Sequence, residues 1–547
     1  MRLVDRRIGL LFGIFLILLA LIGLRAAWLG TVRSGSLSSK ALSQQVEDLK
    51  VSAQRGTIFD RNGVELAVSE DSVTVFADPL LIKNPVRVAG QIAPLLGRPE
   101  SEVLKKIGDR STGFVYLARK IDLSKGQALE KLKITGIGTT IEPKRRYPQG
   151  SLASQVLGSV GTDNWGLSGL EQEFEKTLHG KDGQEKIVKD ALGRPVDIVV
   201  SKQAEAGTDL KLTLDAAIQE RTEAVLAGVG QTFRPKGATA LVMDPRNGEI
   251  LALANWPRVD ANDIGSAPAY ARTNRAVAAS YEPGSTFKAF TVSGALANRL
   301  ITPDTSFDLP PTLQVADRTI KEAHDRGSVT LTTAQILAQS SNIGAVKIGL
   351  KLGPTQFDRW VRRFGFGRGT GVDLPGEAAG IVPKPAQYSG SSLGNLPIGQ
   401  GLAVTPMQMA AAYEAIANGG VIHRPHIVSG MPATPRRVMP ATTARQVSKM
   451  LEGVLGPGGT AQEAKVPGYE LAGKTGTAQK PDPVNGGYSK FKYFASFVGF
   501  APARNPRLLV AVMVDEPQGD IYGGVVAAPA FQKIVSFALP YLKIPPD

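Results

Sequence analysis

An apolar, uncharged stretch near the N-terminus constrains this 547-residue chain more than any other feature. Residues 8–24 carry no charged side chain, and apolar residues continue beyond Arg25 to Leu29. A helix over residues 8–29 would be about 33 Å long, enough to cross a hydrocarbon core of about 30 Å. Three arginines precede the stretch, and such residues stay in the cytoplasm. The sequence therefore predicts a single-pass membrane protein, with residues 1–7 in the cytoplasm and the bulk of the chain outside.

A cleaved signal peptide is the alternative interpretation of this segment. Signal peptides have an apolar region of about 7–15 residues, followed closely by small residues at the cleavage site. The nearest small residues, Ser34-Gly35-Ser36, lie about ten residues beyond the uncharged run. No second apolar run approaches the length of a further span. We therefore expect an uncleaved anchor in the inner or plasma membrane, with the rest of the chain working where ATP is absent.

Charge and composition exclude several classes of protein. The chain has 63 Lys and Arg against 49 Asp and Glu, a net charge of +14, but the basic residues are dispersed except at Lys144-Arg145-Arg146. A nucleic-acid partner is not predicted, because surfaces that bind nucleic acids gather basic residues. The chain has no cysteine, which excludes disulfides and thiolate chemistry. Pro425 separates the one close histidine pair, His423 and His426, so we predict no metal site and no cofactor.

The pattern of apolar residues changes near residue 206 and divides the outer part of the chain. We predict a non-catalytic pedestal domain over residues 30–205, which contains a hairpin at Asn62-Gly63, and a catalytic domain over residues 206–547. In the catalytic domain we predict a helix capped by Asp215, and strands over residues 209–214, 239–243, 249–254, 493–500 and 508–514. Strands at both ends with helical patterns between them indicate one α/β domain, in which distant segments share a sheet.

The segment Glu282-Pro283-Gly284-Ser285-Thr286-Phe287-Lys288 is the first candidate for chemistry. Pro283 and Gly284 interrupt the chain before a helical pattern, which puts Ser285 in the first turn and Lys288 on the same face one turn later. A neutral lysine can activate a serine hydroxyl, and burial lowers the pKa of a lysine. The helix N-terminus supplies N–H groups for developing negative charge. Because S-x-x-K is common by chance, this motif alone decides nothing.

A second motif, Gln339-Ser340-Ser341-Asn342, lies between two helical patterns. A polar break of this kind can present Ser340 and Asn342 to a cleft. Taken by itself, the segment is equally well explained as a helix cap with a turn.

A third motif, Gly473-Lys474-Thr475-Gly476-Thr477, follows near the C-terminus. Lys474 would supply a fixed positive charge. Thr475 and Thr477 would share one face if the segment is extended. Gly476 would let a substrate backbone approach the strand closely.

In this order, S-x-x-K at Ser285, S-x-N at Ser340 and K-T-G at Lys474 resemble the signature of penicillin-binding proteins and serine β-lactamases. The resemblance covers nearly the whole chain and is closest to the class B penicillin-binding proteins. The Glu282-Pro283-Gly284 lead-in looks most like the septal, cell-division branch. Further segments similar to motifs of class B proteins are Arg55-Gly56, Asp60-Arg61-Asn62-Gly63, Arg146-Tyr147-Pro148-Gln149-Gly150, Gly166-Leu167-Ser168-Gly169-Leu170-Glu171, Ile398-Gly399-Gln400-Gly401 and Tyr522-Gly523-Gly524.

The resemblance implies a fold and a reaction. The implied fold is a penicillin-recognising serine transpeptidase domain, with an antiparallel sheet and a helical subdomain, preceded by an elongated mixed pedestal and a single transmembrane helix. The implied activity is D,D-transpeptidation, which cross-links peptidoglycan stem peptides ending in D-Ala-D-Ala through an acyl-enzyme. β-Lactams would bind at the same site. A membrane glycan polymerase and other division proteins would be partners.

The resemblance also implies a role for each residue of the three motifs. Ser285 matches the acylated nucleophile and Lys288 its proton acceptor. Ser340 matches the hydroxyl that relays a proton to the leaving group, and Asn342 matches a contact to the substrate amide. The backbone N–H groups of Ser285 and Thr477 match the oxyanion hole. The substrate carboxylate would be held by the strand that carries Lys474, Thr475, Gly476 and Thr477.

Other interpretations remain open at this point. Residues 468–475 also match the P-loop pattern of nucleotide hydrolases, although prolines stand where the flanking strand and helix are required. Residues 390–394 match the G-x-S-x-G elbow of serine hydrolases around Ser392, again without room for the preceding strand. Within the resembled family, an elongation-branch transpeptidase would share all three motifs. A scaffold or sensor would keep the acylable serine without essential catalysis.

Overall fold

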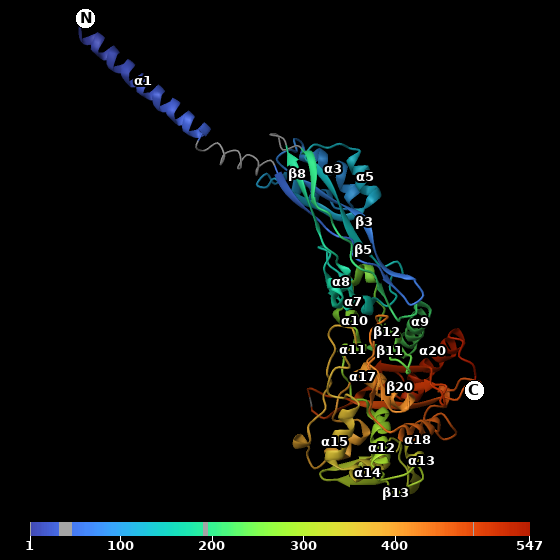
Figure 1. The fold of residues 1–547 in the computed structure, drawn as a ribbon. Helices are drawn as coiled ribbons and strands as arrows, with labels where there is room; N and C mark the ends of the chain where they lie inside the picture. Colours follow the sequence, from blue (N-terminus) through green and yellow to red (C-terminus); the bar gives the residue numbers. More distant parts are fainter. Residues whose placement is uncertain (1, 32–45, 190–194, 485, 547) are drawn as a thin grey trace. The chain divides into compact units, whose positions relative to one another are not determined.

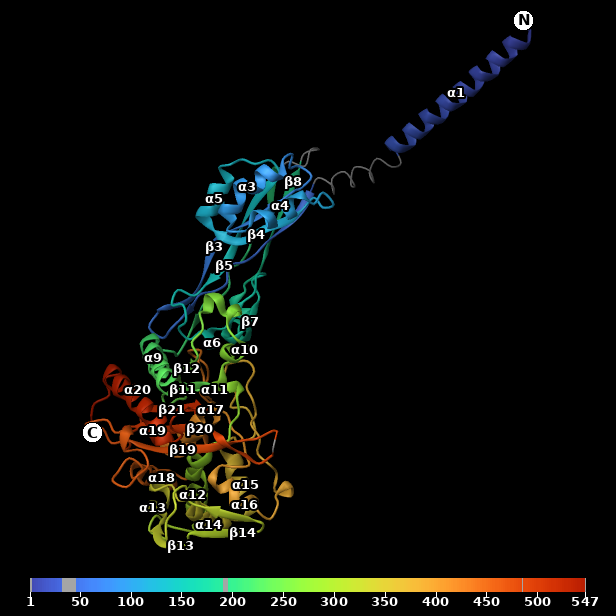
Figure 2. The same ribbon diagram turned by 180° about the vertical axis from the view of Figure 1, so that it is seen from behind.

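The computed structural model describes residues 2–31, 46–189, 195–484 and 486–546, and the chain divides into two compact units (Figures 1 and 2). The first unit comprises Met1–Gln54, Ser72–Pro143 and Gly180–Gly207. The second comprises Arg55–Asp71, Lys144–His179 and Thr208–Asp547. The sequence predicts two consecutive domains that meet near residue 206. In the structure, two stretches of the predicted pedestal, Arg55–Asp71 and Lys144–His179, belong to the same unit as the C-terminal region.

Helix α1 (Arg2–Thr31) contains the apolar stretch that opens the sequence. From Arg6 to Thr31 it is long and apolar enough to cross a membrane. None of its most apolar window is buried within the protein. The helix therefore has the length, composition and exposure expected of a membrane anchor.

The first unit has a hydrophobic core of its own. The core consists of inward-facing side chains of two paired strands and three helices, and Val75, Ala89 and Ile92 in it are fully buried. The elements around it are β3 (Glu65–Ala77), α3 (Pro85–Leu96), α4 (Glu100–Gly108), β4 (Val115–Asp122), α5 (Leu123–Glu130) and β5 (Ile137–Arg146). A separate sheet has the order β1-β8-β9, formed by β1 (Val46–Val51), β8 (Gly183–Lys189) and β9 (Pro195–Lys202).

The hairpin predicted at Asn62-Gly63 is present in the second unit. Strand β2 (Ile58–Phe59) pairs antiparallel with β3 and parallel with β10 (Leu210–Lys211). The turn is closed by Asp60, whose carboxylate accepts hydrogen bonds from the backbone N–H groups of Asn62 and Val64 at 2.7 and 2.8 Å. The remaining early elements of this unit are α6 (Ser154–Leu157), β6 (Ser159–Val160), β7 (Gly166–Ser168), α7 (Gly169–Glu173) and α8 (Glu175–Leu178).

A buried ionic cluster joins three segments of this unit that are distant in sequence. Glu171 accepts hydrogen bonds from Arg55 Nε at 3.0 Å and from Arg145 Nε at 2.6 Å. Arg55 also pairs with Glu175 at 2.8 Å. The side chains of Arg55 and Glu171 are fully buried. Arg55 and Glu171 each belong to a segment that resembles a class B motif, and these contacts give a physical reason for the two residue types at those positions.

Replacing Glu171 by glutamine is expected to lower the free energy of unfolding by about 3–5 kcal/mol, because two buried guanidinium groups lose their shared counter-charge. The measurement is denaturant unfolding of the full chain in detergent. The matched control is Glu70→Gln, which removes an exposed ion pair to Arg146 at 3.1 Å and should cost less than about 1 kcal/mol. Equal losses for the two variants would contradict this expectation.

A five-stranded antiparallel sheet forms the centre of the second unit, with the order β12-β11-β21-β20-β19. It joins four of the predicted strands with β19, which carries the third motif, whereas the strand predicted over residues 209–214 is only β10 and pairs with β2 in another sheet. The strands are β11 (Gly237–Met243), β12 (Ile250–Trp256), β19 (Ala472–Pro481), β20 (Tyr488–Ala501) and β21 (Leu508–Asp515). Every residue of β11 and β21 is buried, which is why both read as continuous apolar runs.

Helices cover both faces of this sheet (Figure 1). On one face, α9 (Ala216–Phe233) and α20 (Ala528–Tyr541) pack on each other and on the sheet, and Phe531 of α20 contacts Phe497 of β20. Asp215 caps α9 as predicted, accepting from the N–H groups of Ala217 and Ile218. On the other face lies α17 (Pro406–Ala417), which is buried along its whole length.

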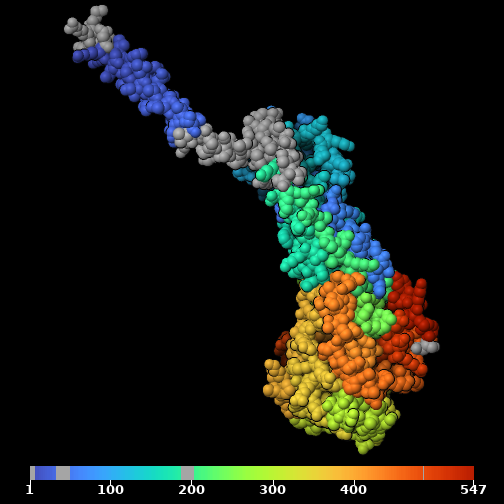
Figure 3. All heavy atoms as spheres, viewed as in Figure 1, coloured from blue at the N-terminus to red at the C-terminus, as the bar shows by residue number. Residues whose placement is uncertain are grey.

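The segment between β12 and β19 supplies the helical part of the unit. The surface of the second unit is formed by residues from both the middle and the end of the chain, as the colours of Figure 3 show. Its principal elements are α12 (Lys288–Ala297), β13 (Ser306–Leu309), β14 (Thr312–Val315), β15 (Arg318–Lys321), β16 (Val329–Thr332), α13 (Thr333–Ala338), α14 (Asn342–Leu352), α15 (Pro354–Arg363), α16 (Ser392–Asn395) and α18 (Ala441–Glu452).

Candidate active site

The structure brings the three sequence motifs together in the second unit. Ser285 lies in a short 3₁₀ turn, Gly284–Phe287, which runs directly into α12. The second motif lies in the turn between α13 and α14, and the third lies on β19, next to the 3₁₀ turn. A cleft of about 240 Å³ opens among them, lined by residues that include Ser285, Lys321, Asn342, Gln400, Thr477 and Gln479.

Lys288 connects the first motif to the second. Its Nζ donates hydrogen bonds to the Ser340 carbonyl oxygen at 2.6 Å, to Ser340 Oγ at 3.2 Å and to Asn342 Oδ1 at 2.7 Å. Burial lowers the pKa of Lys288 to about 7, and the Glu322 carboxylate opposes this shift. Among the described residues no hydrogen bond joins Lys288 Nζ to Ser285 Oγ. A lysine with this pKa is substantially neutral near pH 7 and can accept a proton.

The backbone at Ser340 has an uncommon conformation. Its φ is +60°, in the left-handed region that non-glycine residues seldom adopt. The following residue, Ser341, caps α14 by accepting from the Gly344 N–H at 3.0 Å. This turn directs both the carbonyl oxygen and the hydroxyl of Ser340 at Lys288. Strained backbone of this kind gathers at functional sites.

Glu322 fixes this turn, and no sequence motif drew attention to it. Its carboxylate accepts hydrogen bonds from the Asn342 N–H at 2.7 Å, from Ser341 Oγ at 2.6 Å and from Arg326 Nη2 at 2.6 Å. The side chain is only 7% exposed. Glu322 follows the β14–β15 hairpin and lies twenty residues before Asn342 in sequence, so spacing alone could not reveal the contact.

Glutamine at position 322 is expected to shift the pH midpoint of active-site acylation to lower pH. The Glu322 carboxylate favours the protonated form of Lys288, so neutralising it lowers the pKa of that lysine further. The acylation rate should also fall by about tenfold or more, because charged hydrogen bonds to the turn are weakened. The measurement is the rate of penicillin acylation against pH.

The matched control for this variant is Glu377→Gln. Glu377 also braces a turn, accepting from the N–H groups of Thr370 and Gly371, but it does not line the cleft. Its replacement should leave the pH midpoint unchanged. An unchanged midpoint in Glu322→Gln would contradict the electrostatic role.

Lys474 lies at the inner end of the site on β19. It is fully buried and donates to the carbonyl oxygen and Oγ1 of Thr475 at 3.2 and 3.3 Å. No carboxylate among the described residues pairs with it. Burial and the nearby charge of Lys288 hold the pKa of Lys474 well below its usual value. Burial therefore works against the positive charge that the sequence predicts for Lys474, and an anion bound beside it would offset this effect.

The two threonines of the third motif have different surroundings. Thr477 lines the cleft, and its Oγ1 accepts a hydrogen bond from the Gly523 N–H at 3.1 Å. Thr475 is buried and its hydroxyl contacts Thr460 Oγ1 at 2.7 Å. The structure gives Gly476 a reason other than substrate approach: a Cβ there would lie 2.3 Å from Ser496 Oγ. Glycine therefore lets β19 pack against its own neighbours.

Two competing sequence patterns lack the structural context that they require. Lys474 lies within strand β19, whereas the P-loop lysine must precede a helix. Ser392 begins the four-residue helix α16 and follows a turn instead of a strand. Neither segment has the geometry of the site it resembles. Among the described residues no three His, Asp or Glu side chains gather as metal ligands.

Comparisons with known proteins agree with this geometry. The penicillin binding protein transpeptidase domain matches residues 238–536, and the penicillin-binding protein dimerisation domain matches residues 50–212. The peptidoglycan D,D-transpeptidase FtsI of Escherichia coli (strain K12) is 32% identical, covering 100% of this chain and 93% of the relative. Stage V sporulation protein D of Bacillus subtilis (strain 168) is 34% identical, covering 98% and 85%.

A solved structure is also similar over most of the chain. Penicillin binding protein 3 from Mycobacterium tuberculosis, determined in complex with aztreonam, superposes with a TM-score of 0.72 at 31% identity. The match covers 91% of this chain and 98% of that one.

The chain belongs to the penicillin-binding protein family, and its dimerisation and transpeptidase domains make it a class B member. It is a serine-type enzyme, a peptidoglycan D,D-transpeptidase. The family and the fold expected from the sequence motifs are thereby confirmed.

Proposed function

We propose that this enzyme cross-links peptidoglycan stem peptides through an acyl-enzyme on Ser285, in septal wall synthesis during cell division. The contacts of Lys288 with Ser340 and Asn342 carry the proposal. They join a buried lysine with a lowered pKa, three residues after Ser285, to the second motif. Ser285 Oγ attacks the carbonyl carbon of the penultimate D-Ala, and neutral Lys288 takes the hydroxyl proton.

The leaving group departs when that proton is returned. Ser340 Oγ, at 3.2 Å from Lys288 Nζ, relays it to the amide nitrogen of the terminal D-Ala, and the C–N bond breaks. An amine of a second stem peptide then attacks the ester, forms the new amide and restores Ser285. The backbone N–H groups of Ser285 and Thr477 stabilise the oxyanion in both steps.

Recognition of the substrate carboxylate is assigned to Lys474, Thr475 and Thr477, while Asn342 contacts the substrate amide. Because burial favours the neutral form of Lys474, the arriving carboxylate raises the pKa of that lysine and stabilises its ammonium form. The same carboxylate contacts explain why β-lactams, which carry an equivalent carboxylate, would occupy the site.

Labelling with a fluorescent penicillin tests the acyl-enzyme directly. The full chain is labelled and digested, and the modified peptide is identified by mass. We expect the label on the peptide that contains Ser285. Labelling of another serine, including Ser392, would overturn the site assignment.

The septal role is the finer part of the proposal. It is supported by the likeness to FtsI and by the Glu282-Pro283-Gly284 segment before Ser285. Depletion of this enzyme in its native cell should block division while elongation continues. Rounded cells would indicate an elongation role, and a Ser285→Ala chain that restores division would indicate a scaffold.

The proposal places the catalytic unit outside the cytoplasm, held by α1 as a single-pass anchor with the N-terminus inside. It is supported by the exposed apolar helix and by the arginines that precede it. A periplasm-type reporter fused after Ser36 should be active, and the mature chain should keep its first residues.

A membrane glycan polymerase is the partner that the function requires. It would make the glycan strands whose stem peptides this enzyme cross-links.

A further inference from the structure

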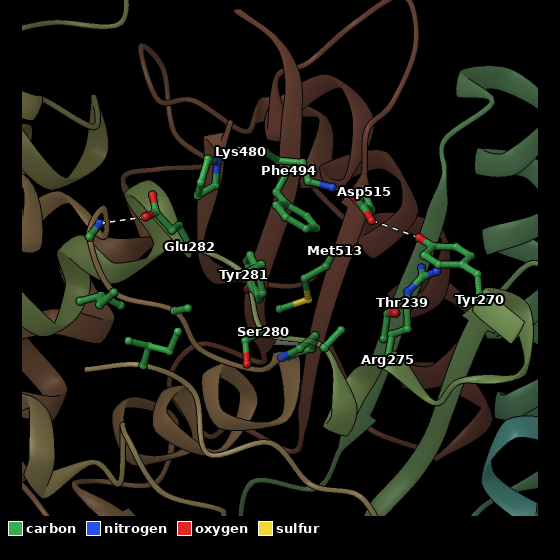
Figure 4. Close-up of a pocket in the computed structure, with 17 residues that line it drawn as sticks. Thr239, Tyr270, Arg275, Ser280, Tyr281, Glu282, Lys480, Phe494, Met513 and Asp515 are labelled. Atoms are coloured by element: carbon green, nitrogen blue, oxygen red, sulfur yellow. Dashed lines mark hydrogen bonds and ion pairs between the residues drawn. The ribbon is translucent and has the colours of Figure 1, made fainter. Parts of the chain in front are cut away.

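A second cavity in the catalytic unit is separate from the cleft at Ser285 (Figure 4). It lies on the face of the sheet that α17 covers, and its volume is about 470 Å³. This is within the range of small-molecule sites, about 300–1,000 Å³. Much of its wall is apolar, formed by Tyr281, Ile381, Leu402, Phe494 and Met513.

A buried arginine whose guanidinium forms no ion pair within hydrogen-bond distance stands at one end of this cavity. Arg275 is only 8% exposed, and its guanidinium stacks on the Tyr270 ring at 4.5 Å. Among the described residues no carboxylate or carbonyl accepts a hydrogen bond from it. The guanidinium packs closely over Gly237, where a Cβ would lie 2.0 Å from Nη1. Leaving a buried charge unpaired is costly.

The carboxylate nearest to this arginine is already used. Asp515 accepts hydrogen bonds from the Tyr270 hydroxyl at 3.0 Å and from Lys480 Nζ at 2.7 Å, one on each oxygen. Lys480 also pairs with Glu516 at 2.7 Å. Asp515 therefore acts on Arg275 only through space, and the guanidinium of Arg275 lacks a direct hydrogen bond to a negative group within the described residues.

Two residues of the cavity wall also carry buried polar atoms without a hydrogen-bond partner. The Tyr281 hydroxyl is buried and has no hydrogen-bond partner, and its residue is only 5% exposed. Glu282 uses one carboxylate oxygen to accept from the Gly401 N–H and the Tyr488 hydroxyl, while the other has no partner. Burial raises the pKa of Glu282, while its contacts with the Gly401 N–H and the Tyr488 hydroxyl work against that shift. Buried polar atoms of this kind normally have a partner.

We propose that this cavity is a binding site for a molecule that carries a carboxylate on an apolar body. The carboxylate would pair with the Arg275 guanidinium, whose fork matches two carboxylate oxygens. The apolar body would lie between Tyr281, Phe494 and Met513. A cation would meet the charges of Arg275 and Lys480, and a neutral apolar molecule would leave Arg275 unpaired. A free organic acid and the C-terminus of a short peptide share this chemistry.

This site does not depend on the acyl-enzyme proposed above, since the cavity and the cleft have no lining residue in common. Acylation of the enzyme by penicillin should therefore fill the cleft and leave the cavity open. Binding to the acylated enzyme reports on the cavity alone, while penicillin labelling reports separately on Ser285.

The test uses the full, penicillin-acylated chain in detergent, with empty micelles as the blank. Two acid–amide pairs are titrated and followed by ligand-observed NMR: 3-phenylpropanoate with 3-phenylpropanamide, and N-acetyl-Ala-Phe with its C-terminal amide. We expect each acid that binds to bind at least about tenfold more tightly than its amide, since a charged hydrogen bond is lost in the amide. Tighter binding of 3-phenylpropanoate would indicate a free organic acid as the ligand. Tighter binding of N-acetyl-Ala-Phe would indicate the C-terminus of a peptide.

Three variants assign the binding to this cavity. Arg275→Met should remove the preference for the acid, and Ile381→Glu should weaken the acid by placing a negative charge at the 67% exposed rim. Arg272→Met is the matched control, because Arg272 is exposed and does not line the cavity. Equal binding of acid and amide, a preference that survives Arg275→Met, or binding lost on acylation would each overturn the proposal.

Discussion

Alanine at position 285 is expected to abolish acylation by penicillin and transpeptidation together. The nucleophilic oxygen is removed, and losses of about 10⁶-fold are typical when a serine nucleophile is deleted. Folding should be unaffected, because Ser285 Oγ makes no hydrogen bond within the described residues, and such a change stays within about 0.5 kcal/mol. The measurements are acylation kinetics with a fluorescent penicillin and thermal unfolding of the same preparation.

Ser392→Ala is the matched control for this prediction. Ser392 occupies the other serine-hydrolase pattern, and its Oγ contacts only Ser389 among the described residues, accepting from the Ser389 N–H at 2.8 Å and lying 3.2 Å from Ser389 Oγ. Its replacement should leave acylation within about twofold of the unchanged enzyme. Full acylation of Ser285→Ala, or ATP binding that depends on Lys474, would show that the site has been misassigned.

Much of the catalytic unit was predictable because its signals are local. The strands at β11, β12, β20 and β21 are short apolar runs bounded by turns, and Asp215 is a regular helix cap. The pairing of β11 with β21 joins residues about 270 positions apart. No local pattern specifies that pairing, and it followed only from the expectation of a single sheet.

The features that sequence reasoning missed are long-range contacts of single residues. Glu322 braces the Ser341–Asn342 turn from another element, and its own surroundings in the sequence, Lys-Glu-Ala-His, carry no signal. Arg275 lacks a hydrogen bond to Asp515 because the two oxygens of that carboxylate are directed at Tyr270 and Lys480. The lowered pKa of Lys474 follows from burial, which the K-T-G motif by itself does not reveal.

Lys288 should make acylation pH-dependent, with the rate rising as the pH increases through about 7. Below that pH the lysine is protonated and cannot accept the proton of Ser285, whereas above it the free amine is available, so the rate rises to a plateau. The measurement is the second-order acylation rate between about pH 5 and pH 9, corrected for the hydrolysis of penicillin without enzyme.

Two variants separate this proton transfer from a structural role of the same side chain. Lys288→Ala should slow acylation by about 10²–10⁴-fold, as for the loss of a general base. Lys288→Arg keeps a positive donor toward Ser340 and Asn342 but cannot be deprotonated in this range, so it should be equally slow at every pH. If Lys288→Arg acylates at the rate of the unchanged enzyme and keeps its pH profile, then Lys288 holds the second motif in place and the base is another group.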